Sequence, residues 1–149
     1  MKLLELPRKN NNCGMQNAVS GMQVDKIVKF TDLNAWKESH KLVLGVYKLT
    51  KTFPSHEQFA LTSQMRRAVV SISSNVAEGF SRHTKADKLH FYTMSHGSLT
   101  EIQNQLLVSR DVGYASVNDI QVLADQTITV DKLLNGLMKA LRAGKGVRS

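Results

Sequence analysis

The stretch from Gln64 to Arg82 constrains the fold more than any other part of the chain. Its apolar residues recur in steps of three and four, which keeps them on one side of an α-helix. Most of the residues between them are small, so neighbouring helices can approach this segment closely. The spacing predicts a helix that presents one apolar face to a core, and the residues of that face are Met65, Ala68, Ile72 and Val76.

Polar residues lie beside that apolar face. Asn75 and Glu78 would each cost about 1–3 kcal/mol if buried without a partner, so we expect both to be paired. The adjacent Arg66 and Arg67 point about 100° apart on a helix and cannot both face one neighbour. One of them can reach an acid such as Glu78 or Glu101, across the bundle or a subunit contact. Solvation of both arginines is the alternative.

The segment closes with a corner at Glu78, Gly79, Phe80 and Arg82. We expect Gly79 to end the helix and Phe80 to close the end of the bundle. The alternative is a partner-binding corner with Arg82 on a phosphate. The candidate packing or subunit contacts are therefore Arg66, Arg67, Asn75, Glu78 and Gly79.

Four segments carry a helical period, one of them containing the stretch described above, and each is bounded by capping or stop residues. The first is expected from Thr31 or Asp32 to about Thr52, where Phe53-Pro54 stops it. The remaining predicted helices run from a capping box at Ser55 and Gln58 to about Gly79, from Thr84, with Asp87 three residues on, to near Gly113, and from Ser116 to Gly144.

Four helices joined by short connections predict an all-α, antiparallel, up-down-up-down four-helix bundle over residues 30–144. Residues 1–29 contain glycine, proline and asparagine that interrupt any period, so we expect a mobile N-terminal arm. Residues 145–149 are expected to form a short basic tail.

The first helix has a wider apolar arc than one bundle seam requires. Two adjacent stripes of three-four spacing cover it, so we expect part of this helix to face another subunit. One stripe contains Leu33, Trp36, His40, Val43 and Tyr47, and the other contains Leu42, Val46, Leu49 and Phe53.

The amino-acid composition indicates a class of binding partner and a cellular compartment. Twenty Lys and Arg against twelve Asp and Glu give a formal net charge of +8, which makes nucleic acid a reasonable partner class. The single Cys13 forms no internal disulfide, which is compatible with a reducing compartment. No apolar run of membrane-spanning length is present, and the opening residues make a poor signal peptide. We expect a cytoplasmic protein with no membrane partner.

The residues that commonly carry chemistry form no convincing site. His40 and His96 fall on apolar stripes, where a core histidine with one hydrogen-bond partner is the ordinary interpretation. A carboxylate-bridged di-metal bundle needs two Glu-x-x-His pairs, whereas this chain offers only Asp87-x-x-His90. Gly-x-Ser-x-Gly turns and phosphate-cradling glycine loops are absent from the sequence. We expect no enzyme activity, no metal and no cofactor.

Lysines on the first helix are the best candidates for binding a polyanion. Lys37 and Lys41 are four residues apart, and Lys48 follows seven residues later on nearly the same side. Lys51 extends the row, and Arg82 is the further candidate for nucleic-acid binding. A solvated lysine face is the alternative. Few exposed aromatic residues are expected, so the sequence gives no support for reading unpaired bases.

Several motifs together resemble a known family. They are Phe30-Thr31-Asp32-Leu33-x-x-Trp36, Val46-Tyr47-x-Leu49-Thr50, Phe53-Pro54 and Gly97-Ser98-Leu99-x-Glu101. From Phe30 to Gly113 the chain resembles the four-helix-bundle proteins encoded in intervening sequences of bacterial 23S ribosomal RNA genes. The resemblance implies a homo-oligomer, with a pentamer as the family's assembly. It also implies nucleic-acid binding, because relatives are basic accessories of reverse transcriptases in diversity-generating retroelements.

These observations lead to two readings of function. The first is an oligomeric, non-enzymatic bundle that binds structured RNA or DNA through a basic surface, with a reverse transcriptase or another protein as a further partner. The second is a protein-interaction scaffold whose charge serves only solubility. A concentrated row of Lys and Arg on one face favours the first, and scattered charge favours the second.

Overall fold

Four α-helices make up most of the part of the chain that the computed structural model describes, residues 26–144. Within that range no segment forms a β-strand. Residues 1–25 of the predicted arm and the predicted tail at 145–149 lie outside the described residues. The elements are η1 (Phe30–Asp32), α1 (Asn34–Thr50), η2 (Ser55–Glu57), α2 (Leu61–Ser81), α3 (Lys85–Asp111) and α4 (Val117–Arg142), where η marks a 3-10 turn.

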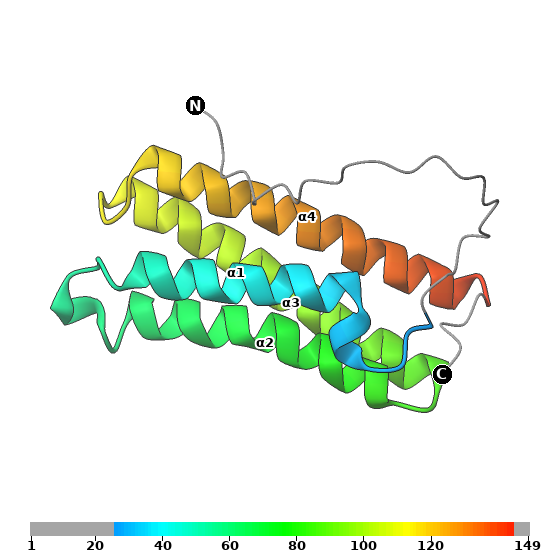
Figure 1. The fold of residues 1–149 in the computed structure, drawn as a ribbon. Helices are drawn as coiled ribbons and strands as arrows, with labels where there is room; N and C mark the ends of the chain where they lie inside the picture. Colours follow the sequence, from blue (N-terminus) through cyan, green and yellow to red (C-terminus); the bar gives the residue numbers. More distant parts are fainter. Residues whose placement is uncertain (1–25, 145–149) are drawn as a thin grey trace, which may run out of the picture.

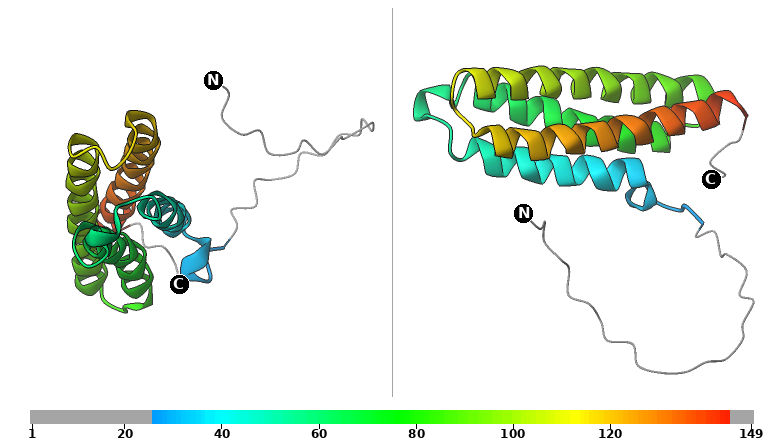
Figure 2. Two further views of the ribbon diagram at one scale, coloured as in Figure 1. Left: turned by 90° about the vertical axis from the view of Figure 1, so that its left-hand side faces the viewer. Right: turned by 90° about the horizontal axis from the view of Figure 1, so that it is seen from above.

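The four helices form an antiparallel bundle. Figures 1 and 2 show them side by side, with successive helices running in opposite directions. Each helix contacts the next one along the chain, and α4 contacts α1, which closes the ring. The predicted all-α, up-down-up-down four-helix bundle is therefore confirmed. None of the helices described is long and apolar enough to cross a membrane.

The core lies along the inner faces that the helical period predicts. All four residues of the apolar face of α2 are buried, and Gly79 is buried on the same helix. On α1 one stripe enters the core, through Leu42, Val46 and Leu49. The neighbouring stripe is only partly covered: Leu33 is buried and Trp36 and Val43 are half-buried, whereas His40 and Tyr47 are exposed.

Three predicted helix boundaries are confirmed by their hydrogen bonds. The Thr84 hydroxyl accepts a bond from the backbone N–H of Asp87 at 3.0 Å, and Ser116 accepts from Asp119 at 3.1 Å. Gly113 has a φ of +77°, in the left-handed region that favours glycine. The N–H groups of Gly113 and Tyr114 then bond the carbonyls of Arg110 and Ser109, which is a Schellman motif.

The predicted start of the first helix is wrong by two to three residues. Thr31 and Asp32 lie in η1, and α1 begins at Asn34 after an extended Leu33. The Asp32 carboxylate accepts bonds from the N–H groups of Lys29 and Val28, both at 2.9 Å. These bonds, Lys29 first, hold the pKa of the Asp32 carboxyl below its ordinary value. Asp32 therefore caps the 3-10 turn instead of α1.

The predicted start and end of the second helix are also corrected. Ser55 begins only η2, without a side-chain capping bond, and α2 starts at Leu61. The side chain that bonds the backbone at this start is that of Glu57 instead of Ser55. The Glu57 carboxylate accepts a hydrogen bond from the Leu61 N–H at 3.1 Å. At the other end the helix continues through Gly79 to Ser81. Gly79 therefore does not end α2.

Two connections meet at one end of the bundle. Tyr114, which follows α3, donates a hydrogen bond from its hydroxyl to Glu57 at 3.0 Å, and its ring lies 5.6 Å from that of Phe53. The Leu61 N–H and this hydroxyl lower the pKa of Glu57, and the carboxylate in turn raises the pKa of Tyr114. These contacts position the segment between α1 and α2, which carries Phe59.

Candidate nucleic-acid interface

The lysines of α1 form one exposed row. At about 100° per residue, Lys37, Lys41 and Lys48 fall within about 40° of one another, and Lys51 lies about 40° to the other side of Lys37. All four are exposed, whereas Val46, about 180° from Lys37 around the helix, is fully buried. The row therefore points away from the core along the length of α1.

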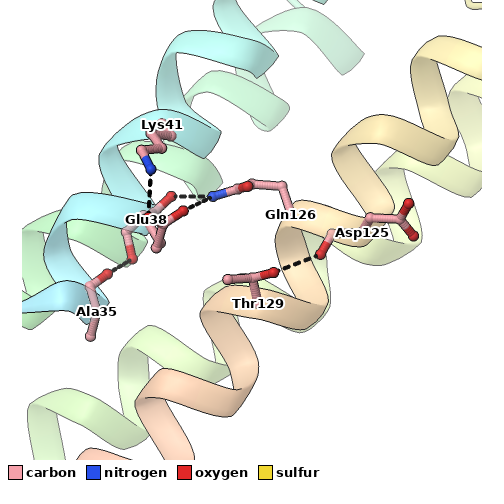
Figure 3. A network of polar contacts seen from close by, with 7 residues as sticks. Ala35, Glu38, Lys41, Asp125, Gln126 and Thr129 are labelled. Carbon is pink, nitrogen blue, oxygen red and sulfur yellow. Dashed lines mark hydrogen bonds and ion pairs between the residues drawn. The ribbon is translucent and has the colours of Figure 1, made fainter. Parts of the chain in front are cut away.

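One lysine of this row is held by a carboxylate. Lys41 Nζ lies 2.6 Å from Glu38 Oε1, and Gln126 on α4 donates to the other Glu38 oxygen at 2.9 Å (Figure 3). The Lys41 bond, and then the Gln126 bond, lower the pKa of Glu38. No carboxylate among residues 26–144 forms an ion pair with Lys37, Lys48 or Lys51. Within this part of the chain, three ammonium groups of the row therefore have no direct ion pair.

Arg82 does not join the lysine row. It follows α2, where its guanidinium pairs with Glu78 one turn earlier and lies 4.7 Å from the ring centre of Phe91 on α3. Both members of the ion pair are about half exposed. The candidate nucleic-acid residues therefore divide into a row on α1 and a separate arginine on the α2–α3 side of the bundle.

The arginine pair on α2 behaves as the 100° separation predicts. Arg66 turns toward α1, where its Nε donates to the Thr50 hydroxyl at 2.9 Å and its guanidinium lies 4.9 Å from the ring centre of Tyr47. Arg67 is exposed on the outer side of α2. The two side chains thus serve different surroundings.

The predicted pairing of these arginines with Glu78 is wrong within the chain. Glu101, the other acid predicted, lines a hollow with Arg67, but no ion pair joins them in the described residues. Glu78 is exposed and pairs with Arg82 instead. Eleven residues of helix separate Arg67 from Glu78, which is about 16 Å along the axis and beyond the reach of both side chains. Glu78 therefore has a partner, as expected, but a solvated one.

Asn75 is hydrogen-bonded within α2, whereas Gly79 contacts α3. The Asn75 amide donates to the carbonyl and to the hydroxyl of Ser71, at 2.9 and 3.0 Å, so its partner lies one turn back on α2. Gly79 faces Tyr92 of α3, and a Cβ at Gly79 would stand 2.6 Å from that ring. Burial raises the pKa of Tyr92 to about 12. Gly79 therefore permits close packing of α2 on α3.

The histidines on the apolar stripes lie at the surface. The His40 ring is exposed and stacks on Trp36 with 5.0 Å between ring centres. His96 Nε2 lies 2.9 Å from Asp131 on α4, with 43% of its side chain exposed. The prediction of core histidines is therefore wrong at both positions. Among residues 26–144, no three His, Cys, Asp or Glu side chains gather as metal ligands would.

The sequence did not lead us to expect an exposed aromatic ring at Phe59. Phe59 is 90% exposed in the connection between η2 and α2. The sequence prediction placed residue 59 inside a helix beginning at Ser55, which gave no reason to expect its ring in water. A signal was available in the spacing, since Phe59 belongs to none of the three-four stripes.

Comparison with known proteins agrees with this fold. Residues 31–136 match the model of the 23S rRNA-intervening sequence protein family. The fold is similar to the crystal structure of a protein of unknown function from the S23 ribosomal protein family of Bacteroides thetaiotaomicron VPI-5482. The TM-score is 0.67 at 18% identity, and the match covers 75% of this chain and 99% of that one. No curated protein matches the chain.

Proposed function

The chain belongs to the 23S rRNA-intervening sequence protein family, and from this premise and the basic face of α1 we propose that it is a non-enzymatic, self-associating protein that binds the phosphate backbone of RNA or DNA. The observation that carries the proposal is the lysine row of α1, defined as Lys37, Lys41, Lys48 and Lys51. It is exposed along its length, and within the described residues only Lys41 has an acidic partner. A formal charge of +8 per chain adds long-range attraction for polyanions.

Self-association is the second part of the proposal. The outer stripe of α1 leaves Tyr47 exposed and Trp36 and Val43 half-buried, so one bundle core does not cover it. A second copy seated on this stripe would remove it from water. The family resemblance points to a homopentamer, which would repeat the lysine row around a ring.

Light scattering at micromolar concentration tests this part. We expect a mass several times the 16.6 kDa of the chain. Dilution should lower the mass at a defined concentration, because assembly follows mass action. A mass of one chain at every concentration would contradict self-association and would leave the lysine row to be judged by itself.

The binding part is tested by moving charge at matched positions. In one variant Lys37 and Lys48 become Glu, since neither is tied to an acid in the described residues. In the control Lys132 and Lys139, exposed on α4, become Glu with the same change in net charge. We expect the α1 variant to bind RNA hairpins and duplex DNA at least tenfold more weakly, and the α4 variant to change affinity by less than threefold. Wild-type affinity should also fall steeply with salt, because each neutralised phosphate releases counterions.

Equal losses in the two variants would mean that only net charge matters, and unchanged binding in the α1 variant would remove the row as the contact.

The competing function is a protein-interaction scaffold. Apolar residues exposed on the outside of α4, among them Val122 and Ile128, favour it. Absence of salt-dependent nucleic-acid binding by the wild-type protein would support that function, with a reverse transcriptase or another protein as the partner.

A further inference from the structure

A hollow of about 650 Å³ lies between α1 and α2, beside their connection. Two arginines, two aromatic rings and several hydroxyl groups line it, and none of the lining residues is acidic. The volume falls within the range of small-molecule sites in proteins, about 300–1,000 Å³. Its lining residues are Tyr47, Gln58, Phe59, Thr62, Ser63, Arg66, Arg67, Val70, Ser71 and Ser74.

The cationic side of the hollow is partly fixed in place. Arg66 is half-buried and is held by its bond to Thr50 and by the ring of Tyr47. Arg67 is exposed and also borders a second, polar hollow against α3, which Glu101 lines as well. Because the lining of the first hollow contains no carboxylate, both guanidinium groups favour an anionic occupant there. Planar guanidinium groups suit phosphate, which they can hold through two hydrogen bonds.

The aromatic side of the hollow is exposed. Phe59 is 90% exposed and Tyr47 is 39% exposed, and Val70 adds apolar surface at 38%. A single exposed apolar residue is ordinary, but here aromatic rings line the same hollow as two arginines and no acidic residue. A nucleobase offers a flat π-face for such rings, and its own phosphate offers charge for the arginines. Ser63 and Ser74, which also line the hollow, have short side chains that take up little of its volume.

We propose that this hollow binds an unpaired nucleotide of RNA or DNA, with the base against Phe59 and a phosphate on Arg67. The inference rests on the proposed function and narrows its partner to nucleic acid that contains a single-stranded segment. Bases inside a duplex are paired and stacked, so they cannot enter. Stacking depends on the π-face that every base has, so the site is expected to tolerate different bases.

The test compares an unstructured oligouridine with a duplex of equal length. In Phe59→Leu the apolar bulk is kept and the ring is lost, and we expect affinity for the single strand to fall by about fivefold or more. Affinity for the duplex should stay within twofold, because the lysine row is intact. Phe59→Trp should restore single-strand binding. Phe30→Leu, at an aromatic residue before α1 that is 38% exposed and packs on Trp36, is the control for loss of an aromatic ring outside the hollow and should leave both affinities unchanged.

A second variant tests the phosphate contact. Arg67→Gln should weaken single-strand binding and lower the slope of affinity against salt by about one counterion. Equal binding of the oligouridine by Phe59→Leu and wild type would overturn the inference, and so would equal losses on both probes. A fall in assembly mass in Phe59→Leu, by light scattering, would assign the hollow to a subunit contact. Each of these outcomes leaves the proposed function standing, since that depends on the Lys37 and Lys48 variant.

Discussion

Replacing Leu42 with alanine is expected to lower the free energy of unfolding by about 2–5 kcal/mol, whereas the same change at Leu44 should stay within about 0.5 kcal/mol. The two leucines are two residues apart on α1. Leu42 is fully buried and Leu44 is 59% exposed. Truncation at Leu42 removes buried methyl groups and leaves a cavity among helices that pack at the density of a crystal. Truncation at Leu44 removes atoms that largely face water.

Urea denaturation of both variants at one protein concentration measures this difference. The concentration must be fixed, because any assembly of subunits adds to apparent stability. We expect the midpoint to move with little change in slope, since the surface exposed on unfolding is nearly the same. Similar midpoints for the two variants would mean that α1 presents a different face to the core. A large loss at Leu44 alone would indicate that this residue is covered by another copy of the chain.

The bundle could be predicted from the sequence because helical periodicity is averaged over many residues. The face of α2 built on Met65 and Ile72 needs only the 3.6-residue repeat, and tertiary packing then buries it. Thr84, Ser116 and Gly113 were also predictable. Each of them satisfies backbone groups within a few residues of itself, so the signal is local.

The starts of α1 and α2 could not be predicted, because local capping signals do not show which of several nearby backbone groups a side chain will bond. Asp32 and Ser55 are both good capping residues, but Asp32 is used before η1 and Ser55 makes no capping bond to α2. The Asp32 carboxylate bonds the N–H groups before η1, and α2 takes its carboxylate from Glu57, which also holds Tyr114. A contact across 57 positions of sequence has no signature in the residues around Ser55.

The candidate site also contains residues that could be placed from the sequence and residues that could not. The exposure of the lysine row follows from the phase of α1, so Lys37 and Lys48 could be placed from the sequence. The Arg66 contact with Thr50 joins two helices, and the water-exposed ring of Phe59 depends on where α2 begins. The Arg66 contact required the packed structure, whereas the sequence signal for Phe59 is its position outside the three-four stripes. The Glu78 assignment failed because burial was inferred from nearness to an apolar stripe, whereas the side chain turns outward to Arg82.

Gly79→Ala should destabilise the protein, while Gly136→Ala should stabilise it. Both glycines lie inside helices, where alanine is favoured over glycine by about 1 kcal/mol. A Cβ at Gly136 would meet nothing within 4 Å, so this gain remains. A Cβ at Gly79 would stand 2.6 and 2.9 Å from two ring atoms of Tyr92 and 3.2 Å from Cβ of Phe91. The Tyr92 ring is buried, so α2 and α3 must separate or the ring must shift, at about 1–3 kcal/mol.

Gly45→Ala is a third case, in which the added Cβ is crowded but the expected loss of stability is smaller than at Gly79. A Cβ there would stand 2.5 Å from Cδ2 of Leu123, but that atom is the end of a flexible side chain, which is buried and borders a hollow beside Gly45. A change of rotamer can relieve this contact, so Gly45→Ala should fall between the other two in a urea series. Opposite signs at Gly79 and Gly136, with Gly45 between them, would show that the rigid Tyr92 ring sets the spacing of α2 and α3. Stabilisation at Gly79 equal to that at Gly136 would mean that the two helices do not approach as closely there.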